Sequence, residues 1–330
     1  MSGVAKITDA AAAAGVAPMT VSRVLNMPDR VSGATRLRVQ EAIDRLGYVP
    51  NLVAGGLSSR RSRVVAAIVP TIASPMFNEP LQAFTDCLDG AGYRVMLALS
   101  GYRPDAEDAL IHAVLTRRPD GLLLTGADHS PAVRRLLRDA GVPVVEIWDA
   151  AAEPTDMLVG FDHAEVSAAV ADFFVAAGHT RFATLAAGDA RATARRDGFA
   201  RRVAEHGFAL TDPGPLPSPS LIRDGRLALA AVAARLAGRT ALFCSSDLIA
   251  FGALTEARML GIAVPGSLAV CGFGDFEISR SGEPAFTTVS VDGAAMGRIA
   301  AEHLLARMTD GAAVARRVLV PFRIVARAST

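Results

Sequence analysis

The chain has 330 residues, of which 51% are hydrophobic and 20% are charged, and its formal net charge is +1. This length predicts two or three domains, and the apolar fraction excludes a disordered chain. No run approaches the roughly 20 apolar residues of a membrane span, and the N-terminus lacks the pattern of an export signal, so we expect a soluble, cytoplasmic protein without a membrane partner. The three cysteines, Cys87, Cys244 and Cys271, are far apart, which argues against a disulfide framework or a zinc finger.

Charge is distributed unevenly along the chain. Residues 1–63 contain nine Lys and Arg against four Asp and Glu, whereas the remaining residues contain 25 against 29. A small basic segment therefore precedes a larger, mildly acidic body. This distribution is typical of a nucleic-acid-binding module joined to a second domain, although a solvated basic tail would have the same composition.

Three short helices are predicted in the first 50 residues. Residues 10–14 are strong helix formers, and the tight turn 15–17 separates them from a second helix that begins at Pro18. A third helix follows Ser32 as its N-cap and ends at Gly47. Its buried face is predicted from helical spacing to consist of Val39, Ala42, Ile43 and Leu46. This arrangement predicts a helix-turn-helix unit.

From residue 64 onward, short apolar runs alternate with segments of helix length. The runs are residues 64–69, 95–99, 121–124, 142–147, 182–186, 241–244 and 268–273. Continuous apolar strands separated by helices predict parallel sheets that are buried on both faces. Because this part is too long for one small sheet, we expect an α/β fold with two doubly wound lobes and a cleft between them, preceded by the small all-α headpiece.

The second helix of a helix-turn-helix unit enters the major groove, and its N-terminal residues reach the base edges. These residues are Pro18, Met19 and, one turn later, Arg23. Of the three, only Arg23 can form two hydrogen bonds with guanine, whereas the other two offer apolar contact. An ordinary three-helix cap with an exposed arginine is the alternative, and spacing alone does not separate the two.

The amino-acid sequence of this segment closely resembles that of one protein family. The matching residues are Asp9, Gly15, Val16, residues 20–26, Val31, Ser32, Thr35, Arg36, residues 46–51, Ala54 and Leu57. Together they resemble the headpiece of the LacI (lactose-repressor) family of bacterial regulators, and the later order of strands and helices resembles that family's periplasmic-binding-protein-like core. The resemblance implies three parts: a DNA-binding headpiece in residues 1–50, a hinge helix and linker in residues 51–63, and an effector-binding and dimerisation domain in residues 64–330.

The resemblance also implies roles for residues of the second helix. Pro18 and Met19 occupy the positions that choose the operator, and Thr20, Ser22 and Asn26 occupy backbone-contacting and structural positions. The chain departs from the family at residue 17, where alanine replaces a serine that could cap this helix. We expect that loss to cost about 1 kcal/mol, partly offset by the proline that follows.

The hinge segment is similar to one that folds only on DNA. By resemblance its contact residues are Asn51, Ala54 and Leu57, and Leu57 inserts into the minor groove. The paired glycines Gly55 and Gly56 each lower helix stability by about 1 kcal/mol relative to alanine, and seven residues are too few to form a stable isolated helix. We therefore expect a conditional helix and a weakened operator contact.

Ligands of two-lobed α/β folds bind at the carboxyl ends of strands. Polar and aromatic residues that follow the apolar runs are Glu146, Trp148, Asp149, Phe161, Asp162, Arg191, Arg195, Ser246, Asp247 and Asp275. An aromatic ring, carboxylates and an arginine suit the C–H face, hydroxyls and carboxylate of a sugar acid. Each residue also has a structural alternative: Asp162 and Asp247 as helix caps, Trp148 as core, Arg191 as an exposed side chain.

The resemblance also limits the class of effector that we expect. Arg195, three residues before Gly198, matches the family's effector-binding arginine, and Phe161 matches an aromatic position beside the effector. Ser246 and the pair Gly274 and Asp275 depart from the pattern of sugar-binding members. Residues 142–149 and 159–162 are most similar to the gluconate-operon repressor branch, which implies an aldonic acid such as gluconate, with a purine as the alternative.

Motifs of common enzymes are absent: the sequence contains no GxGxxG, GxxxxGK[ST], GxSxG or HExxH motif. No enzyme activity, cofactor or metal is predicted. We expect an effector-controlled repressor that binds a pseudo-palindromic DNA operator as a homodimer. A corepressor-dependent regulator and a sugar-binding protein that does not bind DNA are the alternatives.

Overall fold

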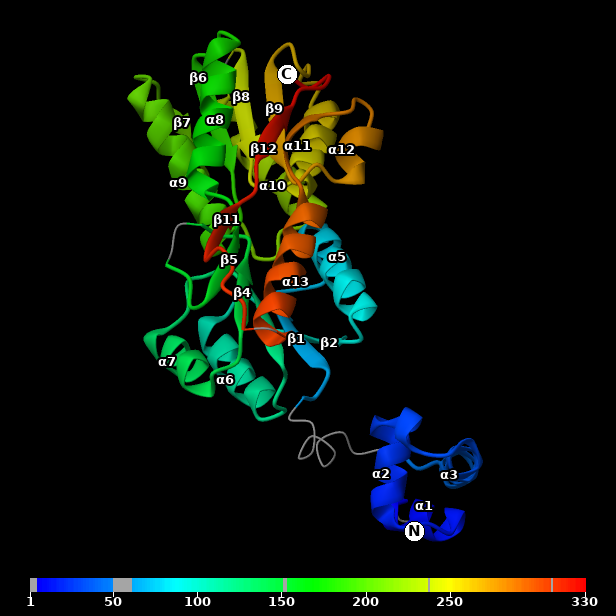
Figure 1. The fold of residues 1–330 in the computed structure, drawn as a ribbon. Coiled ribbons are helices and arrows are strands. Elements are labelled where there is room, and N and C mark those ends of the chain that lie inside the picture. Colours follow the sequence, from blue (N-terminus) through cyan, green and yellow to red (C-terminus); the bar gives the residue numbers. More distant parts are fainter. Residues whose placement is uncertain (1–4, 50–60, 151–152, 237, 310) are drawn as a thin grey trace. The chain divides into compact units, whose positions relative to one another are not determined.

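The computed structural model describes residues 5–49, 61–150, 153–236, 238–309 and 311–330 (Figure 1). The chain divides into two compact units, Met1–Ser62 and Arg63–Thr330, which are treated separately below. The predicted hinge residues Asn51, Ala54 and Leu57 lie outside the described residues. No described helix is long and apolar enough to cross a membrane.

The N-terminal unit contains the three predicted helices: α1 (Ile7–Ala14), α2 (Pro18–Asn26) and α3 (Gly33–Leu46), with a 3-10 turn η1 (Pro28–Arg30) between the last two. Gly15 and Gly47 adopt the left-handed conformation that ends α1 and α3. Ser32 caps α3, because its hydroxyl accepts a hydrogen bond from the backbone N–H of Thr35. Ala17 gives α2 no side-chain cap, as its methyl group dictates.

One predicted core residue of this unit is not in the core. Val39, Ala42 and Ile43 are buried as expected, but Leu46 is 38% exposed. Leu46 is the last residue of α3, and Tyr48, just beyond the helix end, joins the core cluster instead. Helical spacing could not show that the chain turns back at this point.

The first lobe of the larger unit is built on a parallel sheet with the order β11-β5-β4-β3-β1-β2. Its strands are β1 (Val64–Val69), β2 (Arg94–Leu99), β3 (Gly121–Thr125), β4 (Val144–Ile147), β5 (Met157–Gly160) and β11 (Arg317–Leu319). Its helices are α5 (Asn78–Gly90), α6 (Pro104–Leu115), α7 (Pro131–Ala140) and α13 (Gly293–Thr309), and the 3-10 turn η2 (Pro75–Phe77) precedes α5.

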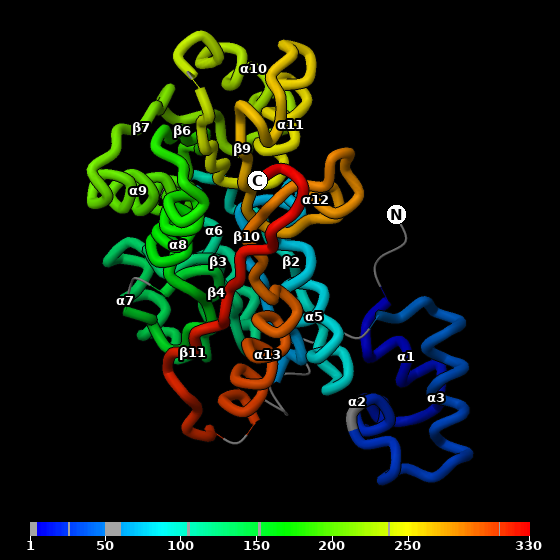
Figure 2. The backbone as a smooth tube through the Cα atoms, turned by 90° about the horizontal axis from the view of Figure 1, so that it is seen from above, coloured from blue at the N-terminus to red at the C-terminus, as the bar shows by residue number. Residues whose placement is uncertain are grey.

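Helices cover both faces of this sheet, as a continuous apolar strand requires. Val65 and Ala67 of β1 belong to the cluster that includes α5 and α13 residues, whereas Ala66 and Ile68 belong to the cluster beneath α6 and α7. Figure 2 shows the two helix pairs on opposite sides of the strands. Gly297 permits the close approach of α13 to α5, because a Cβ there would lie 2.0 Å from the carbonyl oxygen of Pro80.

The second lobe is built on a sheet with the order β12-β10-β9-β8-β6-β7. Its strands are β6 (Arg181–Leu185), β7 (Leu210–Thr211), β8 (Thr240–Cys244), β9 (Leu268–Phe273), β10 (Thr287–Val291) and β12 (Phe322–Val325). Its helices are α8 (His163–Ala176), α9 (Ala190–Glu205), α10 (Ile222–Val232), α11 (Asp247–Met259) and α12 (Glu277–Ser281), and the 3-10 turn η3 (Ala233–Arg235) extends α10.

The expectation of purely parallel sheets is wrong at one edge. β12 pairs with β10 in antiparallel orientation. The reason is the path of the chain, because β11 runs parallel to β5 in the first sheet and continues through residues 320–321 directly into the second sheet. Figure 1 shows this C-terminal segment passing from one lobe to the other.

The two lobes are joined by three crossings. They lie between β5 and α8, between β10 and α13, and between β11 and β12. Three short connections at one side of the sheets allow the lobes to rotate relative to each other about this side, which is the geometry of a hinge. A ligand between the lobes can therefore change their arrangement.

Candidate functional site

The exposed face of α2 is the candidate DNA-contacting surface. Met19 is 64% exposed and Arg23 is exposed, and their spacing of four residues places them on the same face. Val21 and Val24 are buried against the rest of the unit. The remaining predicted contact residues are Pro18, which is exposed, Thr20 and Ser22, which are half-buried, and Asn26, whose side chain lies outside the described residues. The helix thus presents Met19 and Arg23 to solvent on one face.

A small cavity lies between the two lobes. Its free volume is about 40 Å³. It is lined by Ser74, Met76, Phe77, Tyr102, Ala187, Asp189, Arg191, Ala192, Arg195, Pro219, Ser220, Ser245, Ser246 and Leu248. Most of these residues follow the carboxyl ends of strands, as the rule for such folds predicts. Of the predicted effector residues, the structure brings Arg191, Arg195 and Ser246 together here.

Arg195 is a buried cation at the inner wall of this cavity. Arg195 belongs to α9 and is 3% exposed. Its guanidinium lies 4.2 Å from the ring centroid of Phe273. Nη2 donates to the carbonyl oxygen of Ser245 at 3.1 Å, and Nη1 lies 2.9 Å from Nδ1 of His163. Burial lowers the pKa of Arg195 to about 10, so the group stays charged at neutral pH.

The guanidinium of Arg195 has unused hydrogen-bonding capacity. Its Nε atom is buried without a hydrogen-bond partner among the described residues. The carboxylate of Asp189 raises the pKa of Arg195, but no ion pair at contact distance joins Arg195 to a carboxylate among the described residues. A buried charge without a carboxylate in direct contact is costly, and with Arg191 beside it the cavity has two cations against the single carboxylate of Asp189. The site is therefore suited to an anion.

Arg191 extends from the same helix toward the opposite lobe. Its guanidinium lies 5.5 Å from the ring centroid of Phe77, and Nη1 donates to the carbonyl oxygen of Thr125 at 3.4 Å. Gly126 leaves room for this approach, because a Cβ there would lie 3.2 Å from Nη1. Arg191 is thus a direct contact between the lobes. The expectation that it could be a simple exposed side chain is wrong.

An aromatic cluster lies next to the two arginines. Trp148 packs edge-on against Phe77 at 6.1 Å and against Phe161 at 5.6 Å, and Phe161 also contacts Phe273 at 5.9 Å. Trp148 is 4% exposed, and its indole nitrogen has no partner among the described residues. Its backbone φ is +72°, a left-handed conformation that is strained for a tryptophan. Trp148 and Phe161 therefore support the cavity residues from behind.

Asp149 and Asp162 make local contacts. The Asp162 carboxylate accepts hydrogen bonds from the backbone N–H groups of Ala164 and Glu165 and so caps α8, as the structural alternative predicted. Asp149 accepts from the N–H of Ala150. Neither aspartate lines the cavity.

Glu146 belongs to a separate buried cluster in the first lobe. Its carboxylate lies 3.5 Å from Nε2 of His129, and Glu107 lies 3.5 Å from Nδ1 of the same ring. Glu146 also accepts a hydrogen bond from the backbone N–H of Thr155. Burial alone would lower the pKa of His129, but the two carboxylates raise it to about 9. Glu146 is thus a structural residue and not part of the cavity.

This cluster predicts a pH-dependent stability. Because the pKa of folded His129 is about 9 and its ordinary value is 6.5, the stabilisation is fully present below pH 6.5 and is lost as pH rises through 9. Between pH 6 and pH 9.5 we expect the wild-type protein to lose about 3 kcal/mol more unfolding free energy than His129→Gln. Urea unfolding at both pH values measures the difference, and equal losses in the two proteins would contradict this role.

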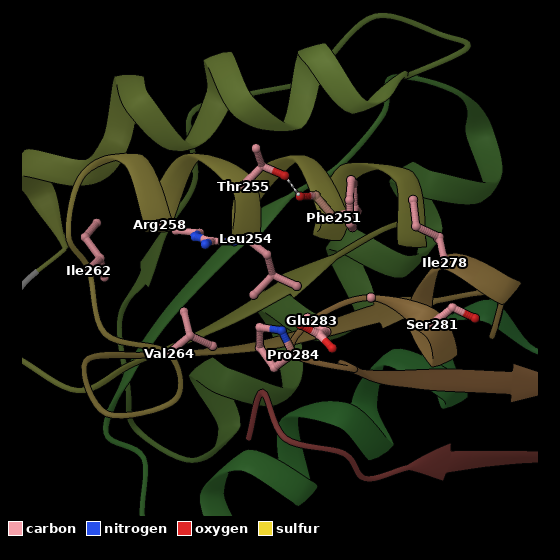
Figure 3. Close-up of a pocket in the computed structure, with 11 residues that line it drawn as sticks. Phe251, Leu254, Thr255, Arg258, Ile262, Val264, Ile278, Ser281, Glu283 and Pro284 are labelled. Carbon is pink, nitrogen blue, oxygen red and sulfur yellow. Dashed lines mark hydrogen bonds between the residues drawn. The ribbon is translucent and has the colours of Figure 1, made fainter.

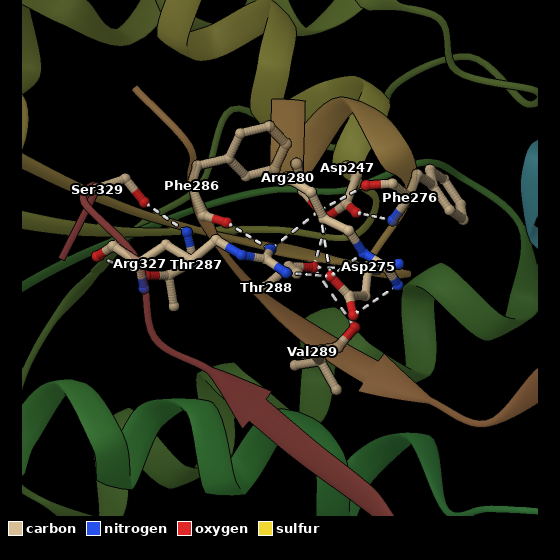
Figure 4. Close-up of polar contacts among 11 residues, drawn as sticks. Asp247, Asp275, Phe276, Arg280, Phe286, Thr287, Thr288, Val289, Arg327 and Ser329 are labelled. Carbon is tan, nitrogen blue, oxygen red and sulfur yellow. Dashed lines mark hydrogen bonds and ion pairs between the residues drawn. The ribbon is translucent and has the colours of Figure 1, made fainter. Parts of the chain in front are cut away.

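Asp247 and Asp275 also lie outside the cavity, in a polar network of the second lobe (Figure 4). Asp247 is fully buried and accepts hydrogen bonds from the hydroxyl of Thr288 at 2.6 Å and the backbone N–H of Phe276 at 2.7 Å. Burial raises the pKa of Asp247 to about 7. Ser246, and not Asp247, caps α11. Asp247 therefore joins α11 to the loop that follows β9 and to strand β10.

Asp275 anchors the C-terminal segment. Its carboxylate pairs with Arg327 at 2.5 Å and with Arg280 at 3.0 Å. The two arginines use the acceptor positions that a sugar hydroxyl would need, so Asp275 is not available to the effector. The predicted assignment of this aspartate to the ligand site is not supported by its surroundings.

A larger groove of about 940 Å³ lies on the second lobe (Figure 3). Phe251 and Leu254 of α11 form one wall, and Ile278 and Pro284 face them. All of its lining residues belong to the second lobe, and most of them are apolar. A ligand there would not act directly on the arrangement of the lobes, so the inter-lobe cavity remains the candidate effector site.

Several cavity residues were not predicted from the sequence. Tyr102 follows β2, so the same strand-end rule could have found it. Burial raises the pKa of Tyr102, so its hydroxyl stays neutral. His163 and Phe77 carry no comparable signal, because their contacts with the arginines depend on the packing of the lobes.

The fold and the site define a class of protein: a helix-turn-helix unit on the same chain as a two-lobed ligand-binding domain is the architecture of an effector-controlled transcriptional regulator. The comparisons agree with it. The family model described as bacterial regulatory proteins, lacI family, matches residues 6–51, and that of a periplasmic binding protein-like domain matches residues 171–330. The HTH-type transcriptional regulator GntR of Escherichia coli (strain K12) is 34% identical over 309 residues, covering 92% of this chain and 91% of the relative.

Solved structures give the same result. A LacI-family transcriptional regulator from Silicibacter pomeroyi is similar with a TM-score of 0.92 and 32% identity, covering 98% of this chain and 99% of that chain. The transcription regulator GntR from Chromobacterium violaceum has a TM-score of 0.73 and 34% identity, with coverages of 81% and 98%. The chain therefore belongs to the LacI family of bacterial regulatory proteins. It is a DNA-binding transcriptional regulator and not an enzyme.

Proposed function

We propose that this regulator is a repressor whose effector is a sugar acid bound between the two lobes, with gluconate as the candidate ligand. The observation that carries the proposal is Arg195, a buried guanidinium with an unpartnered Nε and no ion pair among the described residues. The charged lining residues are Asp189, Arg191 and Arg195, which leave one net positive charge. One carboxylate on the ligand would balance it.

The remaining groups suit the polyol part of such a ligand. The hydroxyls of Tyr102, Ser220 and Ser246 line the cavity and can exchange hydrogen bonds with sugar hydroxyls. The relatives named GntR, at 34% identity, support the gluconate-operon branch that residues 142–149 and 159–162 resemble. A purine, which would stack on aromatic rings and carry no carboxylate, is the alternative ligand.

Binding must be coupled to movement of the lobes. A cavity of about 40 Å³ holds one or two water molecules, which is less space than a six-carbon acid needs. The cavity is therefore too small for a sugar acid, which can enter only when the lobes or the cavity side chains move. We propose that the effector shifts the population toward an arrangement that releases the operator.

Trp148 makes this proposal testable, because it is the only tryptophan of the chain and packs against Phe77 and Phe161 beside the arginines. Titration with gluconate is expected to change its emission saturably, whereas glucose and adenine are expected to leave it unchanged. A response to adenine alone would contradict the proposal. Operator affinity measured with and without gluconate gives the sign: a decrease indicates an inducer and an increase indicates a corepressor.

We propose that the DNA-bound form is a homodimer on a pseudo-palindromic operator, because two-fold symmetry of the protein requires two matching half-sites. Pro18 and Met19 would then select bases, and Thr20, Ser22 and Asn26 would contact the backbone or support the helix. Asn51, Ala54 and Leu57 are proposed as hinge contacts on the family resemblance alone. Because its target is the chromosome, we place the protein in the cytoplasm.

Arg23→Ala tests direct base recognition. If the exposed guanidinium pairs with a guanine, its removal is expected to reduce the preference for the operator over a substituted site by about 1–3 kcal/mol. Competition between operator and unrelated DNA in a gel-shift experiment measures this preference. A uniform loss on all sequences would instead assign Arg23 to a phosphate.

A further inference from the structure

His163 is the first residue of α8 and directly follows the crossing from the first lobe to the second. It is 4% exposed. Its ring packs against the rings of Phe161, at 4.6 Å, and Phe273, at 6.3 Å, and these two rings also contact each other at 5.9 Å. These neighbours restrict rotation of the imidazole, so the directions of its two nitrogens are determined by packing.

The hydrogen bonds of His163 determine its protonation state. Nε2 lies 2.8 Å from the carbonyl oxygen of Trp148, which can only accept, so Nε2 carries the hydrogen. Nδ1 lies 2.9 Å from Nη1 of Arg195, which can only donate, so Nδ1 carries the lone pair. Both contacts are satisfied together only by the neutral tautomer with hydrogen on Nε2.

The charges around the ring favour the same state. The charged groups that act on His163 are Arg195 and Arg191, both cationic. Burial, and then these two cations, hold the pKa of His163 well below its ordinary value. An imidazolium would place an N–H of the ring against an N–H of Arg195.

We propose that His163 is the positioning residue for the effector-binding arginine: its Nδ1 lone pair, aimed by the Trp148 carbonyl, holds the Arg195 guanidinium with Nε directed to the ligand. The guanidinium is then fixed at Nη1 by His163, at Nη2 by the Ser245 carbonyl and on one face by Phe273. Nε has no hydrogen-bond partner among the described residues. A buried arginine that is already oriented loses less entropy when it binds an anion.

The same contacts connect the proposed ligand to the crossing between the two lobes. Trp148 follows β4 of the first lobe, His163 lies at the crossing, and Arg195 lies on α9 of the second lobe. A ligand that moves Arg195 therefore acts on a hydrogen bond at the crossing itself. No other described side chain hydrogen-bonds to the imidazole of His163.

Two substitutions of His163 distinguish the acceptor function of Nδ1 from the donor function of Nε2. His163→Asn keeps an acceptor near the position of Nδ1, whereas His163→Gln keeps a donor near the position of Nε2 and loses the acceptor. We expect the dissociation constant for gluconate, followed by Trp148 emission, to rise less than about threefold in the Asn variant and at least about tenfold in the Gln variant. Circular dichroism and operator affinity without effector are measured in both variants as the controls for folding.

A purely structural role would affect both variants alike and would lower operator affinity with them. Equal affinities for gluconate in the Asn and Gln variants, or a weaker Asn variant, would overturn the proposal. This assay rests on the proposed function, because it needs gluconate to bind the wild-type protein.

A second measurement needs no ligand. In the wild-type protein labelled with ¹⁵N-histidine, one ring is expected to show the neutral tautomer with hydrogen on Nε2 from pH 6 to pH 8. The absence of such a ring would overturn the proposal, and a signal that persists in His163→Asn would do the same. If gluconate fails to bind but this tautomer is found, the choice of effector is wrong and the positioning role stands.

Discussion

Replacing Arg195 with alanine is expected to weaken gluconate binding by about a hundredfold or more and to abolish the response of operator binding to the effector. The guanidinium is buried, and a ligand carboxylate would receive one or two charge-assisted hydrogen bonds from it, each of which contributes about 1.5–3 kcal/mol. Operator affinity without effector is expected to persist, because Arg195 lies in a different unit from α2. Gel-shift titration with and without gluconate measures both quantities.

Arg201→Ala is the matched control for this experiment. Arg201 lies on the same helix, α9, but its side chain is 65% exposed and pairs with Glu205 at 4.0 Å. Its removal is expected to leave the effector response unchanged. If Arg195→Ala still responds to gluconate with the wild-type midpoint, Arg195 is not the carboxylate-binding residue and the proposed site is wrong.

Removing Arg327 is expected to destabilise the second lobe by about 3 kcal/mol, because its partner Asp275 would remain buried with one arginine instead of two. Arg327 also donates to the hydroxyl of Ser279 and the carbonyl oxygen of Phe286, so its loss leaves buried acceptors without partners. Urea unfolding of Arg327→Ala, followed by circular dichroism, measures the change in free energy.

Arg280→Ala provides the comparison in the same network. Arg280 contacts the same carboxylate, but its side chain is 60% exposed. An exposed ion pair contributes about 0–1 kcal/mol, so this variant is expected to unfold at nearly the wild-type urea concentration. A similar loss in both variants would show that burial does not decide the contribution of these ion pairs.

Local structure could be predicted from the sequence wherever local interactions dominate. Gly15, Ser32 and Gly47 end or begin helices through their own backbone and side-chain geometry. The runs at residues 64–69 and 268–273 match β1 and β9. β10, with the sequence TTVSV, was missed because its polar residues break the apolar run, although all but one of them are buried within the sheet.

The candidate effector site could be predicted only in part. Arg191, Arg195 and Ser246 were found from their position after strand ends, and all three line the cavity. The predicted acids Glu146 and Asp275 were misplaced because each is paired with basic residues that are distant in sequence. Sequence spacing identifies the edge of a sheet but not which side chain already has a partner there.

The sequence by itself determined the class of this protein: a basic helix-turn-helix segment with an exposed Arg23, followed by alternating strands and helices that build two lobes. These features depend on propensities and periodicities that act over a few residues. Only the tertiary structure decided that Arg195 lacks a carboxylate partner among the described residues and that His163, 32 residues earlier, accepts its hydrogen bond. Burial and charge pairing at these positions arise from the packing of helices and lobes against one another, and no local pattern encodes them.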